Sequence, residues 1–371
     1  MKFNRSALTK TALATAFLTA SLFAGCGGNH SKTANDSNAG APSSNSESNT
    51  LLGAGSTFVY PLFSRLFAEY ATKTGVRVNY QSIGSGGGIL QLTNKTIDFG
   101  DSDAPLNDDQ AKKIGVPVLH IPMCSGAVVI SYNLPELKTP LKLTPDVLAD
   151  IFLGRITKWN DPRLVNINPG ITLPGTAIFI AHRSDGSGTT NIFTTYLAKV
   201  STQWAGGPGK GSAINWPAGL GGKGNEGVAG LIKQTPGAIG YIELAYAIQN
   251  KMSYAGICNK SGSFIMPTVA STSAAGNISI PADAKVSLTD TEAKDGYPIS
   301  GFTWALIYKE QNYNNRSIDR AKKLVDLLWW NTHDGQKFCT GLNYAQLSPA
   351  AVAVAEKILR SATYSGKPLL Q

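Results

Sequence analysis

Cysteine is scarce in this sequence: 371 residues contain only four, and no two of them form a CxxC pair. Small disulfide-stapled domains and zinc sites built on paired cysteines need the opposite pattern, so both are excluded. Beyond Cys26 the chain has Cys124, Cys258 and Cys339, and at most one bridge can form among these three. Cys124 stands in an apolar stretch, where we expect a buried, unreactive thiol.

Motifs of hydrolytic and metal enzymes are also missing. None of the four histidines belongs to an HExxH motif; they are His30, His120, His182 and His333. Ser187 stands between two glycines but outside a GxSxG frame, so a nucleophile elbow is not supported. Residues 222–227 match GxGxxG but follow a loop rich in Trp, Pro and Gly, which favours a surface loop over a dinucleotide site. We therefore expect no catalytic residue, no cofactor and no metal.

Charge is sparse and evenly spread. Charged residues make up 15% of the chain, and the formal net charge is +9. The basic residues form no cluster or stripe of the kind that binds nucleic acid. Without Lys2, Arg5 and Lys10 at the N-terminus, 30 of the 33 basic residues remain against 24 acidic ones. This mild positive excess favours anionic partners.

No apolar run is long enough to span a bilayer, which takes about 20 residues in a helix. The most apolar run, residues 11–23, is interrupted by Thr and Ser and follows the three basic residues of the N-terminus. A short apolar run behind a positive segment predicts a cleavable export signal over residues 1–25.

The predicted signal ends in Phe23-Ala24-Gly25-Cys26, with small residues before the cysteine. This ending resembles the bacterial lipoprotein box, although Leu is usual where Phe23 stands. The resemblance implies cleavage before Cys26, a lipid such as palmitate on its thiol, and a membrane anchor on the periplasmic or cell-surface face. Residues 26–50 then form a flexible tether, because they have almost no large apolar side chain. An ordinary signal peptide with Cys26 incidental is the alternative.

From Leu51 to Gln371 the composition is globular, and the length suggests two domains. Short apolar runs predict strands at 76–80, 97–100, 116–121, 127–132, 177–181 and 237–241. Helical spacing predicts helices over 60–74, from Ile89, from Thr144-Pro145, up to Leu197, over 317–330 and over 348–361. This alternation is typical of the α/β class with a largely parallel sheet.

Three predicted strand-to-helix turns are rich in glycine and carry Ser or Thr: 53–58, 84–88 and 185–189. Each places free backbone N–H groups, a hydroxyl and the positive end of a helix at one spot. A single turn of this kind is commonplace helix capping. Three in one α/β protein suggest a shared anion site, because ligands bind where parallel strands end.

Three ionisable residues narrow the choice of anion. Arg183 offers a fork of donors for an oxyanion, and Asp185 is placed to hold that fork. Asp103 would repel an anion unless the anion carries a proton to donate. Phosphate keeps a proton at neutral pH and sulfate does not, so Asp103 predicts selection of phosphate over sulfate.

Several segments together resemble the phosphate-binding protein of the high-affinity phosphate ABC transporter. In chain order they are residues 53–58, 83–88, 98–106, 183–189, 216–217, 219–225 and 236–241. The resemblance covers nearly the whole chain from Leu51, and the motifs stand in the family's order.

The resemblance implies a type II periplasmic-binding-protein fold, with two lobes of mixed, largely parallel sheets and crossing hinge strands. The first lobe would be 51–123 with a return over 289–371, and the second lobe 124–288. By position, the phosphate contacts would be Thr57, Phe58 through its N–H, Ser85, Asp103, Arg183, Ser187, Gly188 and Thr189, with Asp185 pairing with the arginine. Partners would be inorganic phosphate and the permease and ATPase subunits of an importer, with no nucleic acid, and we expect a monomer.

Asp101 departs from the family pattern, which often has a small apolar residue there. An extra carboxylate two residues from Asp103 would lower phosphate affinity or shift the pKa of Asp103. The favoured alternative is that strand alternation points this carboxylate away from Asp103. Other ligands and activities stay open: arsenate or a phosphonate as the anion, and, less favoured, a phosphatase. A structural or adhesive lipoprotein is disfavoured, because structural helices do not need Asp103 and Arg183 at their starts.

Overall fold

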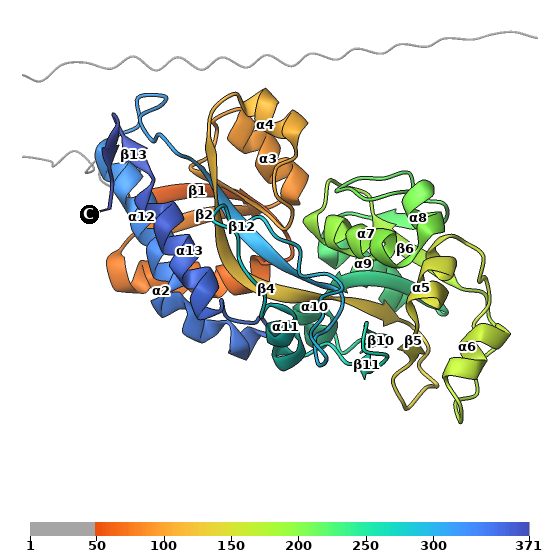
Figure 1. Cartoon of the computed structure of the whole chain (residues 1–371). Helices are drawn as coiled ribbons and strands as arrows, with labels where there is room; N and C mark the ends of the chain where they lie inside the picture. Colours follow the sequence, from red (N-terminus) through yellow and green to blue (C-terminus); the bar gives the residue numbers. More distant parts are fainter. Residues whose placement is uncertain (1–48, 371) are drawn as a thin grey trace, which may run out of the picture. The chain divides into compact units, whose positions relative to one another are not determined.

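A nine-stranded sheet organises the part of the chain that this computed structural model describes, residues 49–370 (Figure 1). Its order is β2-β1-β3-β12-β4-β8-β6-β7, and β9 pairs with β4 off this path. The strands are β1 (Thr50–Gly55), β2 (Arg77–Ser82), β3 (Phe99–Ser102), β4 (Val118–Tyr132), β6 (Phe179–Arg183), β7 (Leu220–Gly222), β8 (Ala238–Glu243), β9 (Ser253–Tyr254) and β12 (Ser300–Tyr308). The predicted export signal, Cys26 and most of the predicted tether lie outside the described residues.

Parallel pairing is confined to the two ends of the sheet. At one end β1 pairs in parallel with β2 and β3, and at the other β6 pairs in parallel with β7 and β8. Between them β12 runs antiparallel to β3 and β4, and β4 runs antiparallel to β8. Each parallel group with its helices forms one lobe, so the predicted α/β fold with two lobes and crossing strands is confirmed, and the sheet is mixed.

Strand β4 crosses from one lobe to the other. The sequence predicted two strands here, 116–121 and 127–132, and this is wrong, since one strand of 15 residues, Val118–Tyr132, includes most of the first range and all of the second. It spans about 50 Å. Its first part pairs with β12 and its last part with β8. Pro122 is tolerated within it because the register shifts between Thr303 and Trp304, the residues paired with Cys124 and Pro122.

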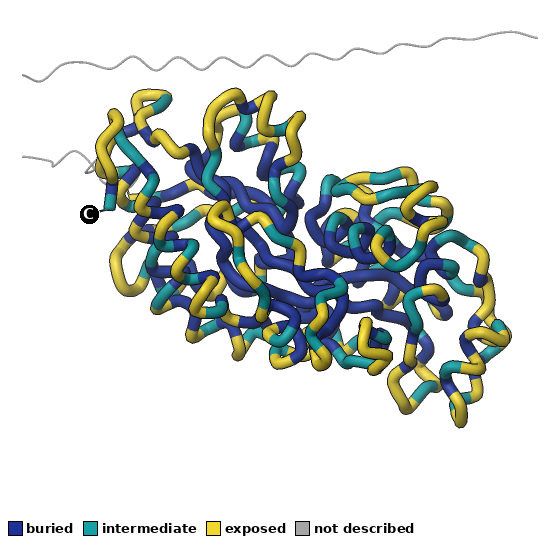
Figure 2. Tube along the Cα trace, viewed as in Figure 1, coloured by how far each residue is buried: buried dark blue, intermediate teal, exposed yellow. Residues whose placement is uncertain are grey.

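Helices cover the sheet with their apolar faces inward, as the buried strands and exposed outer turns of Figure 2 show. They are α2 (Tyr60–Thr74), α3 (Ser85–Thr93), α4 (Asp108–Ile114), α5 (Pro145–Phe152), α6 (Pro162–Ile167), α7 (Gly188–Val200), α8 (Thr202–Gly206), α9 (Gly224–Gln234), α10 (Leu244–Gln249), α11 (Val269–Ala275), α12 (Ile318–Thr332) and α13 (Pro349–Arg360). Small strands β5 (Lys142–Leu143), β10 (Gly256–Cys258), β11 (Phe264–Ile265), β13 (Thr363–Tyr364) and β14 (Lys367–Pro368) complete the fold with two 3-10 turns, Asp334–Phe338 and Thr340–Leu342. No helix among the described residues is long and apolar enough to cross a bilayer.

Helix α3 begins four residues earlier than predicted, at Ser85 instead of Ile89. The glycine run is therefore part of the helix, although glycine is a poor helix former. Packing explains the choice: a Cβ on Gly88 would lie 2.4 Å from the carbonyl oxygen of Ala54 in β1. Only glycine lets the start of α3 approach β1 this closely.

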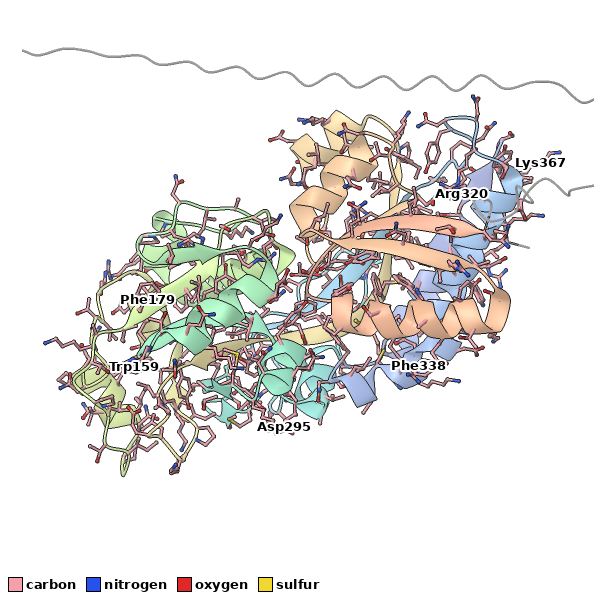
Figure 3. The ribbon with its side chains drawn as sticks, turned by 180° about the vertical axis from the view of Figure 1, so that it is seen from behind. Trp159, Phe179, Asp295, Arg320, Phe338 and Lys367 are labelled. Carbon is pink, nitrogen blue, oxygen red and sulfur yellow. The ribbon has the colours of Figure 1, made fainter. Side chains whose placement is uncertain are left out.

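Asp98, just before β3, joins helix α12 to the sheet. Its carboxylate forms ion pairs of 2.8 Å with Arg316 and 2.6 Å with Arg320, and Asp98 and Arg316 are both almost fully buried. Arg320 is labelled in Figure 3. The backbone N–H of Leu52 donates to the same carboxylate at 2.6 Å. This buried charge is therefore fully compensated.

Candidate functional site

The three predicted anion-binding turns meet where the two lobes touch. They connect β1 to α2, β2 to α3 and β6 to α7. Ser85 Oγ accepts hydrogen bonds from the N–H of Gly188 at 3.0 Å and of Asp103 at 3.4 Å. The N–H of Gly86 donates to the carbonyl of Gly186 at 2.8 Å. Segments far apart in the sequence thus form one polar centre.

Glycine at position 188 is required by the closeness of these turns. A Cβ at this position would lie 2.5 Å from the Cβ of Asp103. Any side chain would push the second lobe away from the strand end that carries Asp103, so the N-terminus of α7 would move away with it. The backbone N–H groups of this helix start are thereby held beside Asp103.

The turn after β1 contributes a hydroxyl that the sequence analysis did not single out. Ser56 Oγ donates to Asp103 Oδ2 at 2.8 Å and accepts from the N–H of Phe58 at 2.9 Å. The Phe58 N–H, a predicted anion donor, therefore points at the same centre as Asp103. A small hydroxyl residue beside the predicted Thr57 was the available signal.

Arg183 and Asp185 form a two-pronged pair. Arg183 Nε donates to Asp185 Oδ1 at 2.7 Å and Nη2 donates to Oδ2 at 2.6 Å. Nη1 lies 3.4 Å from the hydroxyl of Thr189, so this edge of the guanidinium faces the start of α7. Burial raises the pKa of Asp185, but the hydrogen bonds and charge of Arg183 outweigh it and hold the pKa below its ordinary value. The pair fixes a buried cation with one edge free of Asp185.

The start of α7 combines capping with further donors. Ser187 Oγ accepts from the N–H of Thr190 at 3.0 Å and so caps the helix. Thr189 is fully buried, and its hydroxyl accepts from Asn225 Nδ2 at 3.2 Å. All eight predicted contact residues are buried at this centre: Thr57, Phe58, Ser85, Asp103, Arg183, Ser187, Gly188 and Thr189.

A fourth turn, between β7 and α9, belongs to the same centre. The prediction of a surface loop at 222–227 is wrong, since this segment joins the end of β7 to the first turn of α9. Asn225 is fully buried, and its Nδ2 donates to the hydroxyl of Thr57 at 2.8 Å. The N–H of Gly224 donates to Asp185 Oδ1 at 3.1 Å. Since these groups at the start of α9 bind Thr57 and Asp185, they leave no free cradle for a dinucleotide.

Asp103 is the acceptor among these donors. Thr303 donates to its Oδ1 at 2.7 Å, and Ser56 donates to its Oδ2. Burial raises the pKa of Asp103 more than the hydrogen bonds of Ser56 and Thr303 and the charge of Arg183 lower it, and the net pKa is about 6. Asp103 is thus ionised at neutral pH and lies close to its protonation point.

The orientation expected for Asp101 is wrong. Asp101 and Asp103 are two residues apart, and on extended backbone such residues share a face. The hydroxyl of Thr303 contacts both carboxyls, at 2.8 Å from Asp101 Oδ1. β3 also runs to Ser102, beyond the predicted end at Gly100, so Asp101 is a strand residue. Burial, followed by the charge of Asp103, raises the pKa of Asp101 well above its ordinary value.

The fold defines a class of protein. Its two lobes, crossing strands and helix starts gathered at the lobe junction are those of a type II periplasmic-binding protein. Residues 40–328 match the model of the PBP superfamily domain, and the chain belongs to that superfamily.

Similarity to known proteins places the chain within a particular family of this class. It is 42% identical over 327 residues to the phosphate-binding protein PstS of Xylella fastidiosa strain Temecula1, covering 86% of this chain and 88% of that protein. It is also 42% identical over 305 residues to the PstS protein of Pasteurella multocida, covering 81% and 87%. A solved phosphate-binding protein from Stenotrophomonas maltophilia shares the fold, with a TM-score of 0.62 and 16% identity over 86% of this chain and 96% of the other. The chain belongs to the PstS family of phosphate-binding proteins.

Proposed function

We propose that this protein binds inorganic phosphate between its two lobes and delivers it to the permease and ATPase subunits of an ABC importer. The observation that supports this most is one buried carboxylate, Asp103, among converging donors. An anion bound there must supply a proton to Asp103. Phosphate at neutral pH can do so, and the relatives described above are named for phosphate binding.

The proposed contacts come from both lobes. Thr57, Phe58, Ser85 and Asp103 lie on one lobe, and Ser187, Gly188 and Thr189 at the start of α7 lie on the other with Arg183. Asp185 positions the guanidinium without reaching the anion. The role of the chain is retention and hand-over of phosphate, with no reaction catalysed.

We further propose lobe boundaries at 51–123, 124–288 and 289–371, with a hinge where β4 passes from β12 to β8. Because both lobes supply contacts, phosphate should draw them together. The radius of gyration from small-angle scattering should decrease when phosphate is added to a phosphate-depleted sample. A radius that stays constant while calorimetry shows binding would argue against lobe closure.

Titration calorimetry on residues 49–371 tests the function directly. Phosphate should bind, sulfate should bind far more weakly, and arsenate, which is also protonated at neutral pH, reports how closely the site discriminates between protonated anions. Arg183→Lys is the matched variant: it keeps the positive charge but loses the planar fork, so phosphate affinity should fall by about tenfold or more. Sulfate binding as tight as phosphate binding, or release of phosphate from a phosphomonoester, would contradict the proposal.

Membrane anchoring through Cys26 is a separate proposal. It rests on the signal-like residues 1–25 and the small residues before Cys26. Cys26→Ser should move the protein from the membrane fraction to the soluble exported fraction, and Cys124→Ser should leave it on the membrane. A Cys26→Ser protein that stays in the membrane fraction after a salt wash would disprove the anchor.

A further inference from the structure

One hydroxyl lies between two buried carboxyl groups at this site. Thr303 Oγ1, on β12, is 2.8 Å from Asp101 Oδ1 and 2.7 Å from Asp103 Oδ1. Both carboxyls are almost fully buried, at 0% and 2% exposure, so bulk solvent screens their charges little. Both contacts have hydrogen-bond length.

Proton counting limits the charge of this trio. A threonine hydroxyl has one proton to donate and can also accept. If both carboxyls were ionised, one of the two contacts would join two oxygen atoms without a proton between them. Two negative charges would also share a buried space, which strongly raises the proton affinity of one of them. One of the two carboxyls therefore holds a proton and donates it to Thr303.

The surroundings decide which carboxyl is neutral. Asp103 accepts from Ser56 on its second oxygen and faces the positive charge of Arg183. Asp101 Oδ2 is buried and has no hydrogen-bond partner among the described residues. An unpaired oxygen costs far less on a neutral carboxylic acid than on a carboxylate. Asp101 is therefore the protonated member.

We propose that Asp101 is a neutral carboxylic acid that donates to Thr303, so that Thr303 donates to Asp103 and holds it as an ionised acceptor for the anion's proton. Asp101 and Thr303 are positioning residues. The role assigned to Asp103 rests on the proposed function, whereas the proton on Asp101 does not.

Other ionisable groups around the trio favour the same state. Tyr80 on β2, Cys124 on β4 and Glu243 on β8 surround it, and burial is the first cause that raises the pKa of each. None of these groups brings a positive charge. Among residues 49–370, Arg183 is the cation that lowers the pKa of Asp103, and no cation there lowers the pKa of Asp101. The neutral state of Asp101 should therefore persist across the neutral pH range.

Infrared spectroscopy of the ligand-free protein tests the proton directly. With carbon-13 in the aspartate side chains, the wild type at pH 8 should show the carbonyl band of a protonated aspartic acid. This band should vanish in Asp101→Asn and remain in Asp103→Asn. Aspartate labelling separates it from any signal of Glu243. Absence of the band in the wild type, or its loss only in Asp103→Asn, would overturn the proposal.

Binding measurements test the relay. Asp101→Asn keeps a neutral donor beside Thr303, so phosphate affinity should stay within about threefold and its pH profile should not move. Thr303→Val removes the donor to a buried charge, so phosphate affinity should fall about tenfold or more and the acid limb of the profile should move to higher pH. Thr303→Ser restores the hydroxyl and should restore both quantities.

The outcomes separate the two hypotheses. Tighter phosphate binding by Asp101→Asn, with the acid limb moved to lower pH, would mean that Asp101 is ionised in the wild type and would overturn the relay. A Thr303→Val protein with wild-type melting temperature and unchanged binding would also overturn it. A wild type that shows the infrared band but binds no phosphate would refute the proposed function and leave the proton on Asp101 in place.

Discussion

Asp98 and Asp101 are three residues apart, both buried, and neutralised in different ways. The carboxylate of Asp98 forms ion pairs with the guanidinium groups of Arg316 and Arg320. The carboxyl of Asp101 contacts the hydroxyl of Thr303, which also contacts Asp103, and no guanidinium contacts Asp101 among the described residues. At Asp98 the guanidinium groups of Arg316 and Arg320 balance the charge of the carboxylate. At Asp101, on our proposal, a bound proton makes the carboxyl group neutral.

The two arrangements serve different ends. The Asp98 cluster ties α12 to the edge of β3 through charges that cannot be removed singly without penalty. The contact between Asp101 and Thr303 lies beside Asp103. An extra cation there would neutralise the Asp103 carboxylate, which is the proposed acceptor that distinguishes anions by their protons. A buried proton stabilises Asp101 without disturbing that acceptor.

The largest loss of stability should come from removing the buried ion pairs of Asp98. Asp98→Ala leaves Arg316 buried without its partner, and the free energy of unfolding should fall by about 3–5 kcal/mol. Denaturant unfolding measures it. Asp334→Ala, which breaks the exposed pair with Lys73, is the control and should change stability by less than about 1 kcal/mol. Equal losses in the two variants would show that the buried cluster has no special weight.

Changing the acceptor should alter selectivity more than stability. Asp103→Asn can both accept and donate, so phosphate binding should weaken modestly and sulfate binding should gain. The phosphate-to-sulfate affinity ratio should fall by at least about tenfold, because each mismatched buried hydrogen bond costs about 1–3 kcal/mol. Calorimetric titration of both anions measures the ratio. If Asp103 only positions Arg183, both anions will weaken by the same factor.

Sulfate affinity should depend on pH through the protonation of Asp103. The pKa of Asp103 is raised to about 6, so the carboxyl is ionised above that pH and protonated below it. Protonation removes a repelling charge and adds a donor, so sulfate affinity should rise about tenfold as pH falls from 7 to 5, following the protonated fraction. The Asp103→Asn protein should lack this rise. A flat sulfate profile in the wild type would contradict the assigned protonation.

The raised pKa of Asp103 also determines how the free energy of unfolding changes with pH. Because the folded state holds the Asp103 proton more tightly than the unfolded state does, this residue's contribution to stability is present at low pH. It is lost as pH rises through about 6. In the ligand-free protein, the difference in unfolding free energy between wild type and Asp103→Asn should change with pH in this window and be constant above it.

The smallest effect should come from Glu243, on the hypothesis that this buried carboxyl is neutral in the folded protein. Burial raises the pKa of Glu243 well above its ordinary value, and its Oε1 has no partner among the described residues. Glu243→Gln preserves shape and neutrality, so stability should change by less than about 1 kcal/mol. Asp98→Asn, the same chemical change at a charged site, should cost more. A large loss in Glu243→Gln would indicate that Glu243 is ionised.

Local sequence patterns predicted which residues form helices and strands better than they predicted where each helix or strand begins and ends. Helix α2 begins and ends where the apolar spacing indicates, and α12 and α13 lie within two residues of expectation. β4 was divided in two because Pro122 and Gly126 normally interrupt strands, and only the bulge against β12 shows how the proline is accommodated. The start of α3 was missed because its glycines serve a contact with β1 rather than helix propensity.

At the candidate site, too, local sequence patterns predicted some features and missed others. Turns rich in Gly, Ser and Thr predicted three of the helix starts, and Ser56 lies in one of these turns, but no local pattern indicated that Ser56 contacts Asp103 or that Asn225 joins the site. Both residues contact groups from other turns, and Asn225 does so across 168 positions. The orientation of Asp101 could be predicted from the sequence, because residues two apart on a strand share a face.

The sequence by itself determined the α/β class, the helix starts able to bind an anion, and the presence of a carboxylate and a guanidinium near them. These follow from periodicity, backbone geometry and side-chain chemistry over a few residues. Tertiary structure decided which turns meet and that the Thr303 hydroxyl lies between Asp101 and Asp103. The physical reason is that proton affinity depends on burial and on neighbours brought together from distant strands, and no local pattern carries that information.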